Sequence, residues 1–311
     1  FDGDLVTKRI ESDILKHWYI TTMAHKTLHY YYEKAGKEKW ALAQFNVSCA
    51  EQLQGVVEVG VQTCSPLLIG TSEGDAGFFT PSFAVNLVAF WKKETGLPIF
   101  LNFDHGKSFD VLERAAKAGY DALHFDGSKL PLEENITIAK QVVEMARKHH
   151  ISVVEGEFSE VPGGHSDLHS EVAPVLTDKD YTNPADAADF MRKSGIDSLA
   201  VMVGTLHGIF KTTQPLNIER LQEISERGIA FLVLHGGSGT PEQELKDAIQ
   251  RGVVKINVST DLRIAFTNAL KETMQENPAE IAPYNLLPKS VAAVKQVALT
   301  WIGICGSANK I

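Results

Sequence analysis

Three histidines stand at the ends of apolar runs in this sequence, and glycine follows each of them. His105 comes after PIFLNFD, His207 after SLAVMVGTL and His235 after AFLVL. Side chains at strand ends can converge on one point although they are far apart in sequence. Three neutral imidazoles around an open position are an arrangement that holds a catalytic zinc ion. The carboxylate of Asp104, next to His105, adds a proton acceptor.

Each histidine taken alone is also typical of an ordinary strand–loop junction. The strand–histidine–glycine pattern nevertheless occurs three times, on the third, sixth and seventh apolar runs of the chain. This repetition favours a shared site over three unrelated positions.

The composition limits the classes of partner. The chain has 311 residues, 44% hydrophobic and 22% charged, as in ordinary globular domains. Its net charge of −9 argues against nucleic acid or an anionic membrane as a partner, and an anionic substrate needs a local positive site. No apolar stretch approaches the roughly 20 residues of a membrane span.

The cysteines and the first residues bear on location. Cys49, Cys64 and Cys305 are odd in number and lack metal-binding spacing, which favours a reducing compartment, the cytoplasm. The start, FDGDLVTKRI, has no apolar signal-peptide segment and no initiator methionine, so we expect the true N-terminus to be missing or processed.

Short apolar runs alternate with amphipathic segments from residue 41 onward. The predicted strands are 41–47, 66–72, 98–104, 121–126, 151–158, 198–204, 230–236 and 253–259. Between them, apolar residues recur at helical spacing, as at Leu132, Ile136 and Ala139. The alternation predicts an α/β fold, a (β/α)8 TIM barrel, with an open doubly wound sheet as the alternative. The absence of G-x-G-x-x-G after the first strand argues against dinucleotide binding.

We expect a single barrel domain over residues 1–311. Residues 1–40 are predicted to be a helical N-terminal extension, 41–276 the barrel, and 277–311 a tail that contains a C-terminal helix. In such a barrel the chemistry lies at the carboxyl ends of the strands. The predicted strand-end residues are Asp104, His105, Glu157, His207, His235 and Asn257. The irregular stretch Ser159–Thr182 is predicted to be a flap over this face.

Two glycine- or serine-containing turns predict an anion site at the same face. HGGSG (235–239) leads into a helix near Pro241, and NVSTD (257–261) leads into the last barrel helix. Backbone N–H groups at such helix starts bind phosphate. Two other conspicuous features are interpreted as structural: His124 as core filling, and the aromatic run HYYYEK (29–34) as packing of the N-terminal helix.

A series of motifs resembles that of the class II, metal-dependent fructose/tagatose-bisphosphate aldolases. The motifs run in order from about Trp40 to Phe266: QFNVS, TSEG, NFDHGKSF, FDGSKLPLEENI, GTLHGIFK, VLHGGSG and KINVSTDLRIAFT. The resemblance implies a (β/α)8 enzyme, a homodimer or homotetramer. It also implies reversible cleavage of a ketose bisphosphate to dihydroxyacetone phosphate and an aldehyde.

The resemblance also implies roles for individual residues. His105, His207 and His235 are implied zinc ligands, with Glu157 as an alternative or neighbouring metal contact, and Asp104 as the acid/base for the C4 hydroxyl. The residues implied to bind the substrate or its phosphate are Asn46, Ser72, Gly208, Lys211, Gly236, Gly237, Ser238, Asn257, Ser259, Thr260 and Arg263. A monovalent cation, Na⁺ or K⁺, near the phosphate is also usual in the family.

The chemistry of these residue types agrees with that assignment. Breaking C3–C4 leaves a carbanion that must be stabilised as an enediolate, and Zn²⁺ can act as the Lewis acid. A base next to a metal ligand can remove the C4 proton, and such help is typically worth about 10²–10⁴-fold.

The sequence departs from the family pattern in the flap and at the substrate-specificity position. The stretch after Glu157 has one residue more before Gly163-Gly164 and no acidic pair directly after it, so Glu160, His165 and Asp167 are all candidates for the C3 proton carrier. Ser259 leaves open whether the sugar is fructose or tagatose.

The distal-phosphate region departs as well. Arg263 matches a family arginine, but Ala282 and Tyr284 stand where an aspartate and a second arginine are common. A charged, bidentate phosphate contact thus becomes a neutral one unless Lys289 compensates.

Two alternatives remain at this point. A Schiff-base aldolase would need a buried lysine, and Lys255 shares strand parity with Asn257, but this route leaves the three histidines without a role. A sensor or inactive homologue could keep the metal and phosphate sites, but it would have no use for Asp104.

Overall fold

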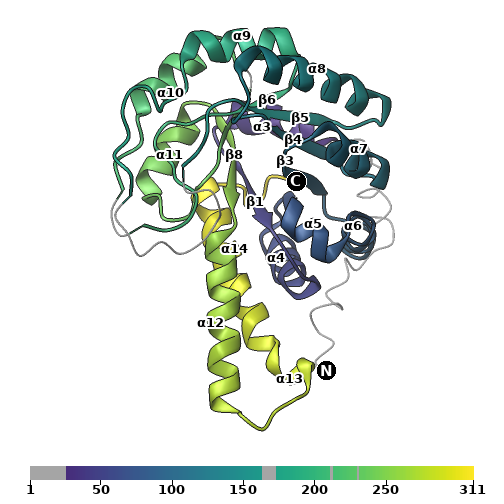
Figure 1. The fold of residues 1–311 in the computed structure, drawn as a ribbon. Helices are drawn as coiled ribbons and strands as arrows, with labels where there is room; N and C mark the ends of the chain where they lie inside the picture. The colour runs from purple at the N-terminus through teal and green to yellow at the C-terminus, as the bar shows by residue number, and fades with distance from the viewer. Residues whose placement is uncertain (1–25, 163–172, 211–212, 230) are drawn as a thin grey trace.

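Eight parallel strands close into a barrel in the computed structural model, which describes residues 26–162, 173–210, 213–229 and 231–311 (Figure 1). Each strand pairs with its sequence neighbours, and β1 pairs with β8 to complete the ring. The strands are β1 Leu42–Asn46, β2 Leu67–Ser72, β3 Ile99–Gly106, β4 Ala122–Asp126, β5 Val153–Glu157, β6 Ser198–Ala200, β7 Leu232–Leu234 and β8 Val253–Val258. The predicted (β/α)8 fold is therefore confirmed, and the open sheet is excluded.

Helices surround the barrel, and at least one helix connects each strand to the next (Figure 1). Their bounds are α3 Leu28–Glu38, α4 Ala50–Thr63, α5 Glu73–Phe79, α6 Pro81–Thr95, α7 Phe109–Ala118, α8 Leu132–Lys148, α9 Pro184–Ser194, α10 Ile218–Ser225, α11 Glu242–Gln250, α12 Thr260–Glu276, α13 Pro283–Leu286 and α14 Pro288–Cys305. No helix among the described residues is long and apolar enough to cross a membrane.

Local sequence signals explain where the helices begin and end. The Asn183 side chain accepts hydrogen bonds from the Ala185 and Asp186 N–H groups, and Pro184 occupies the first turn of α9. Gly195 ends this helix with a φ of 75°, a conformation that glycine adopts without strain.

Strands β6 and β7 are shorter than predicted. The prediction extended β6 to residue 204, but the ladder stops at Ala200. Beyond it, Met202 N–H donates to Thr182 Oγ1 and Met202 C=O accepts from Thr182 N–H, at 2.8 Å each, so this backbone pairs with a loop instead of a strand. His207 consequently lies on a loop seven residues after β6.

The helix α3 packs against the amino-terminal ends of the strands. Tyr31 and Tyr32 are buried together with Leu28 and Trp40 in a cluster that includes Phe100 of β3. The interpretation of the aromatic run 29–34 as packing of the N-terminal helix is thus confirmed. Residues 1–25 lie outside the described residues, and the division into 1–40, 41–276 and 277–311 stays a prediction.

Helices α12 and α14 run side by side and extend beyond the barrel, with α13 between them (Figure 1). Trp301 Nε1 donates to Asp261 Oδ2 at 2.8 Å, and Ser290 Oγ donates to Phe266 C=O at 3.0 Å. These bonds fasten the C-terminal helix to the helix that follows β8.

Truncation of Leu28 tests the importance of the α3 contact. Leu28 is fully buried, so Leu28→Ala should leave a cavity and lower the free energy of unfolding by about 2–5 kcal/mol. Denaturant titration measures this, with the exposed Lys37→Ala as control, for which we expect a change within about 0.5 kcal/mol. Equal midpoints and slopes for Leu28→Ala and the parent would show that α3 does not stabilise the barrel.

Candidate metal centre and active site

A cavity of about 350 Å³ opens at the carboxyl ends of the strands. Among its lining residues are Asn46, Ser72, Asp104, His105, Glu157, His207, Gly208, His235, Gly236, Gly237, Ser238, Asn257, Ser259, Thr260 and Arg263. The structure thus brings together all the candidate residues that it describes. Lys211, His165, Asp167 and the centre of the predicted flap lie outside the described residues.

His105 and His235 face each other inside the cavity. His105 Nε2 lies 2.9 Å from His235 Nδ1. A carboxylate holds the other nitrogen of each ring, since His105 Nδ1 lies 2.9 Å from Asp126 Oδ2 and His235 Nε2 lies 2.7 Å from Glu155 Oε1. Carboxylates that bind the outer nitrogen of a histidine fix the ring and its tautomer, as they do at protein metal sites.

His207 approaches this pair from the loop after β6. Its ring centroid lies 5.1 Å from that of His105 and 6.1 Å from that of His235. Burial and the neighbouring His105 and His235 lower the pKa of His207 to about 3. Burial and His105 also lower the pKa of His235, so both rings are neutral, the form that binds metal ions.

Two groups of side chains are close enough together to hold a metal ion. Asp104, His105, His124 and His235 offer ligand atoms that all lie within 4.8 Å of one another. A second group with the same property consists of His105, Asp126 and Glu157. Among the described residues, neither group includes His207, whose role as a ligand stays a prediction.

His124 was interpreted as core filling, and this interpretation is wrong. It is fully buried, but its ring lies between Asp104, with Nδ1 3.4 Å from Oδ1, and Glu157, with Nε2 3.2 Å from Oε2. The signal in the sequence was strand parity: His124 precedes Asp126 by two residues, so both side chains face the barrel interior.

Buried atoms without partners indicate that these residues fit a cation. Glu157 Oε2 and His124 Nε2 are both buried and face each other at 3.2 Å, but within the described chain neither makes a hydrogen bond. Unsatisfied buried polar atoms are rare in proteins, and an ion is one of the groups that satisfy them. Imidazole nitrogens and carboxylate oxygens are also the ligand types that zinc accepts.

The contacts of His124 define its tautomer. The backbone N–H of His105 donates to Nδ1 at 3.0 Å, which only an unprotonated Nδ1 can accept. The ring proton therefore lies on Nε2, which faces Glu157 Oε2 at 3.2 Å.

Asp104 is a buried base held by two amides. Asn46 Nδ2 donates to Oδ2 at 2.8 Å, and Asn257 Nδ2 lies 3.1 Å from Oδ1 and 3.2 Å from Oδ2. Burial raises the pKa of Asp104, but the charge of His105 and, more weakly, that of Lys255 outweigh it and lower the pKa well below its usual range. The carboxylate is therefore ionised and fixed beside the metal-ligating candidates.

Lys255 points into the barrel, as its parity predicted, but its amine is engaged. Nζ lies 2.6 Å from Glu155 Oε2, and neither residue is more than 2% exposed. The other oxygen of Glu155 contacts His235, so one carboxylate joins the lysine to a candidate metal ligand. This position makes Lys255 a charge partner and leaves no free amine for an imine.

The glycine-rich turn after His235 packs too closely for side chains. A Cβ on Gly236 would lie 2.3 Å from Leu206 O, and the φ of Gly236 is 66°. A Cβ on Gly237 would lie 2.6 Å from Ile256 Cγ2. Gly236, Gly237 and Ser238 line the cavity together with Thr260 at the start of α12, and the start of a helix suits an anion.

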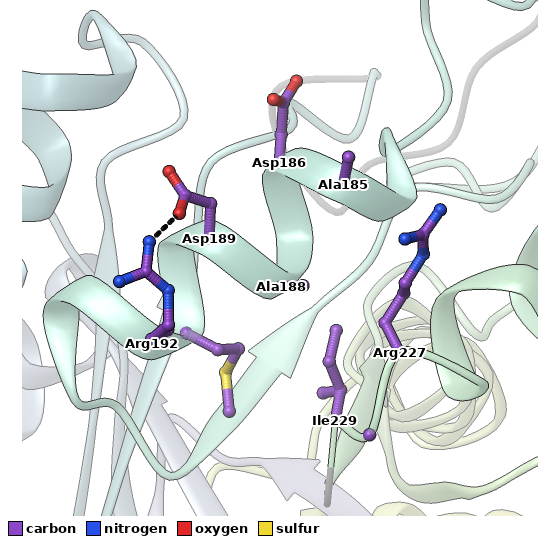
Figure 2. A pocket seen from close by; sticks show the side chains of 9 residues that line it. Ala185, Asp186, Ala188, Asp189, Arg192, Arg227 and Ile229 are labelled. Atoms are coloured by element: carbon purple, nitrogen blue, oxygen red, sulfur yellow. Dashed lines mark hydrogen bonds and ion pairs between the residues drawn. The ribbon is translucent and has the colours of Figure 1, made fainter.

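A second hollow lies between α9 and the turn that precedes β7 (Figure 2). It is lined by Ala185, Asp186, Ala188, Asp189, Met191, Arg192, Arg227, Gly228 and Ile229. Asp189 and Arg192 pair with each other there, and no histidine lines the hollow. It lacks the converging ligands of the strand-end cavity.

A (β/α)8 barrel with histidines and carboxylates gathered at its strand ends is typical of metal-dependent barrel enzymes. The family model described as "Fructose-bisphosphate aldolase class-II" matches residues 26–310. The chain therefore belongs to the class II fructose-bisphosphate aldolase family, and it is a ketose-bisphosphate aldolase, a carbon–carbon lyase.

Individual relatives agree with this assignment. The chain is 35% identical over 278 residues to the D-tagatose-1,6-bisphosphate aldolase subunit GatY of Klebsiella oxytoca, covering 89% of this chain and 96% of that protein. Its fold is similar to the crystal structure of the YdjI aldolase from Escherichia coli K12, with a TM-score of 0.78 and 31% identity over 91% and 98% of the two chains. A putative fructose-1,6-bisphosphate aldolase from Coccidioides immitis shares the fold, with a TM-score of 0.79 and 24% identity over 92% and 98%.

Removal of the Lys255 charge tests the buried ion pair. Lys255→Met should leave the Glu155 carboxylate uncompensated and lower the free energy of unfolding of the metal-free protein by about 3–5 kcal/mol. The matched control is the double variant Glu155→Gln/Lys255→Met, which removes both charges and should recover most of the loss. A double variant no more stable than the single one would contradict the pairing.

Proposed function

We propose that this chain is a zinc-dependent aldolase that reversibly cleaves a ketose 1,6-bisphosphate. Fructose 1,6-bisphosphate is the first candidate substrate. The products are dihydroxyacetone phosphate and glyceraldehyde 3-phosphate. One observation carries the proposal: the ionised Asp104 lies between two amides and directly beside the facing pair His105 and His235.

Zinc would be held by His105, His207 and His235, with Glu157 as an alternative or neighbouring contact. When bound, zinc supplies a Lewis acid that stabilises the negative charge developing on the ketone oxygen. The outer nitrogens of His105 and His235 stay bound to Asp126 and Glu155, which keeps both rings aimed at the cavity.

Asp104 would carry the proton chemistry of C–C cleavage. Its carboxylate takes the proton of the C4 hydroxyl, the C4 oxygen forms the aldehyde, and the C3–C4 electron pair remains with the dihydroxyacetone phosphate half. In the reverse direction Asp104 returns the proton. Asn46 and Asn257 hold the carboxylate in place, and Asn257 and Ser72 would contact the substrate carbons.

The phosphate of the dihydroxyacetone half would bind at the backbone-lined end of the cavity. Gly208, Gly236, Gly237, Ser238 and Thr260 line this end, and Lys211 is proposed to join them. A monovalent cation, Na⁺ or K⁺, is proposed to bind near the same phosphate. The distal phosphate would bind Arg263.

A tagatose 1,6-bisphosphate substrate is the second candidate. It is supported by the small residue Ser259 in the cavity and by the 35% identity to a D-tagatose-1,6-bisphosphate aldolase subunit. Comparing kcat/KM for the two C4 epimers decides between them. For the assembly we propose a homodimer or homotetramer in the cytoplasm.

Metal removal and site substitution test the central proposal. Exhaustive chelation should abolish fructose 1,6-bisphosphate cleavage, and added zinc should restore it. His207→Ala or His235→Ala should lose zinc and rate together, whereas Asp104→Ala should keep zinc and lose rate by about 10²-fold or more. Full turnover after chelation, or borohydride trapping of substrate on Lys255, would overturn the metal mechanism.

The distal phosphate offers an independent test. Arg263 Nη2 lies 3.4 Å from Asp75 Oδ1, Tyr284 is 78% exposed, and Lys289 is engaged with Glu276 and Glu272. A charged contact is worth about 1.5–3 kcal/mol and a neutral one about 1, so distal-phosphate affinity should be roughly tenfold lower than with two arginines.

The measurement is kcat/KM for fructose 1,6-bisphosphate against fructose 1-phosphate. We expect weak discrimination, and Arg263→Leu should reduce it further. A preference for the bisphosphate above about a thousandfold in the parent would show that another cation replaces the missing arginine.

A further inference from the structure

Adjacent residues of a regular strand point to opposite faces of the sheet. Asp104 and His105 are adjacent in β3, yet both side chains reach the cavity. Asn102 also faces the barrel interior, where its amide donates to Gln44 Oε1 at 2.9 Å. A Cβ on Gly106 would instead meet Leu112 of the surrounding helix α7 at 2.5 Å. The alternation is therefore broken at His105.

A β-bulge produces this break. Between β3 and β4, Phe103 pairs with Leu123 and Gly106 with Phe125, so two residues of β3 stand opposite one residue of β4. The two are Asp104 and His105, and the one is His124. His105 adopts a φ of 51°, a left-handed conformation that costs energy for a residue other than glycine and must be held by its surroundings.

The side chain of His124 holds the bulge. A bulge leaves backbone groups of the extra residue without a ladder partner. Here the His105 N–H donates to His124 Nδ1 at 3.0 Å, and the same nitrogen lies 3.4 Å from Asp104 Oδ1. The imidazole is fully buried, so no water replaces this acceptor without a rearrangement of the site.

We propose that His124 is a positioning residue for the aldolase reaction: it accepts the His105 N–H and so fixes the bulge that turns Asp104 and His105 together toward the metal. His124 acts through these two neighbours. The inference rests on the proposed function for its link to zinc, but the bulge contact exists in the metal-free protein and can be tested there.

Two substitutions separate the acceptor from the volume of the ring. His124→Asn keeps an acceptor, Oδ1, near the position of Nδ1, whereas His124→Leu fills a similar space without one. The first readout is hydrogen exchange of the His105 backbone amide in metal-free, ¹⁵N-histidine-labelled protein. We expect exchange roughly tenfold faster or more in His124→Leu, because the N–H loses its buried partner, and protection largely restored in His124→Asn.

The second readout is zinc affinity by chelator competition, together with kcat and KM. Loss of a residue that orients a metal ligand typically weakens metal binding about 10–100-fold, so His124→Leu should show this loss and a lower kcat, with KM little changed. His124→Asn should recover most of both. Val154→Ala is the control for general destabilisation, since Val154 is buried on the opposite face of β5 among the helices.

The outcomes distinguish the two proposals. If the parent binds no zinc, the proposed function fails, and the amide exchange still decides the role of His124. If the parent binds zinc but His124→Leu leaves both the His105 amide and zinc affinity unchanged, the positioning role is wrong. It is equally wrong if His124→Asn is no better than His124→Leu, or if Val154→Ala produces the same changes.

Discussion

Charge neutralisation inside the barrel mouth is the constraint on which the site depends. Asp104, Glu155 and Glu157 are at most 2% exposed, and buried carboxylates are costly unless cations accompany them. Among the residues that the structure describes, Lys255 is the one buried lysine or arginine. Three carboxylates close to one ammonium form a buried, mainly acidic cluster, which attracts a cation. The neutral forms of His207 and His235 fit this balance, since they provide ligands without adding charge.

Backbone geometry orients the groups of this charged cluster toward the cavity. The bulge in β3 places a base and a candidate ligand side by side, and the glycine turn after β7 brings backbone to the cavity wall. The two ends of the substrate would thus be bound by different means. In the proposed function the proximal phosphate would meet backbone that a substitution cannot remove, whereas the distal phosphate would depend on the side chain of Arg263, which Asp75 already contacts.

Strand-end residues were predictable from the sequence because parallel strands of a barrel bring their carboxyl ends to one face. Asp104, His105, Glu157, His235 and Asn257 were found in this way, and all line the cavity. The roles of His124 and Glu155 were not predicted from the sequence. A polar residue within an apolar strand gives the same sequence pattern whether it fills the core or supports a site. The bulge was equally hidden, since residue order does not show which position breaks the alternation. The end of β6 depends on pairing with Thr182, a contact of tertiary structure.

The same carboxylate, Glu155, explains why imine chemistry and metal chemistry exclude each other here. An imine requires a neutral amine that can reach the substrate carbonyl. Lys255 Nζ lies 2.6 Å from Glu155 Oε2, so proton loss would leave that buried carboxylate without its cation. Glu155 Oε1 at the same time orients His235, a candidate ligand. Conversion of Lys255 to a nucleophile would therefore disturb this candidate ligand, because the Glu155 carboxylate that pairs with Lys255 also holds His235.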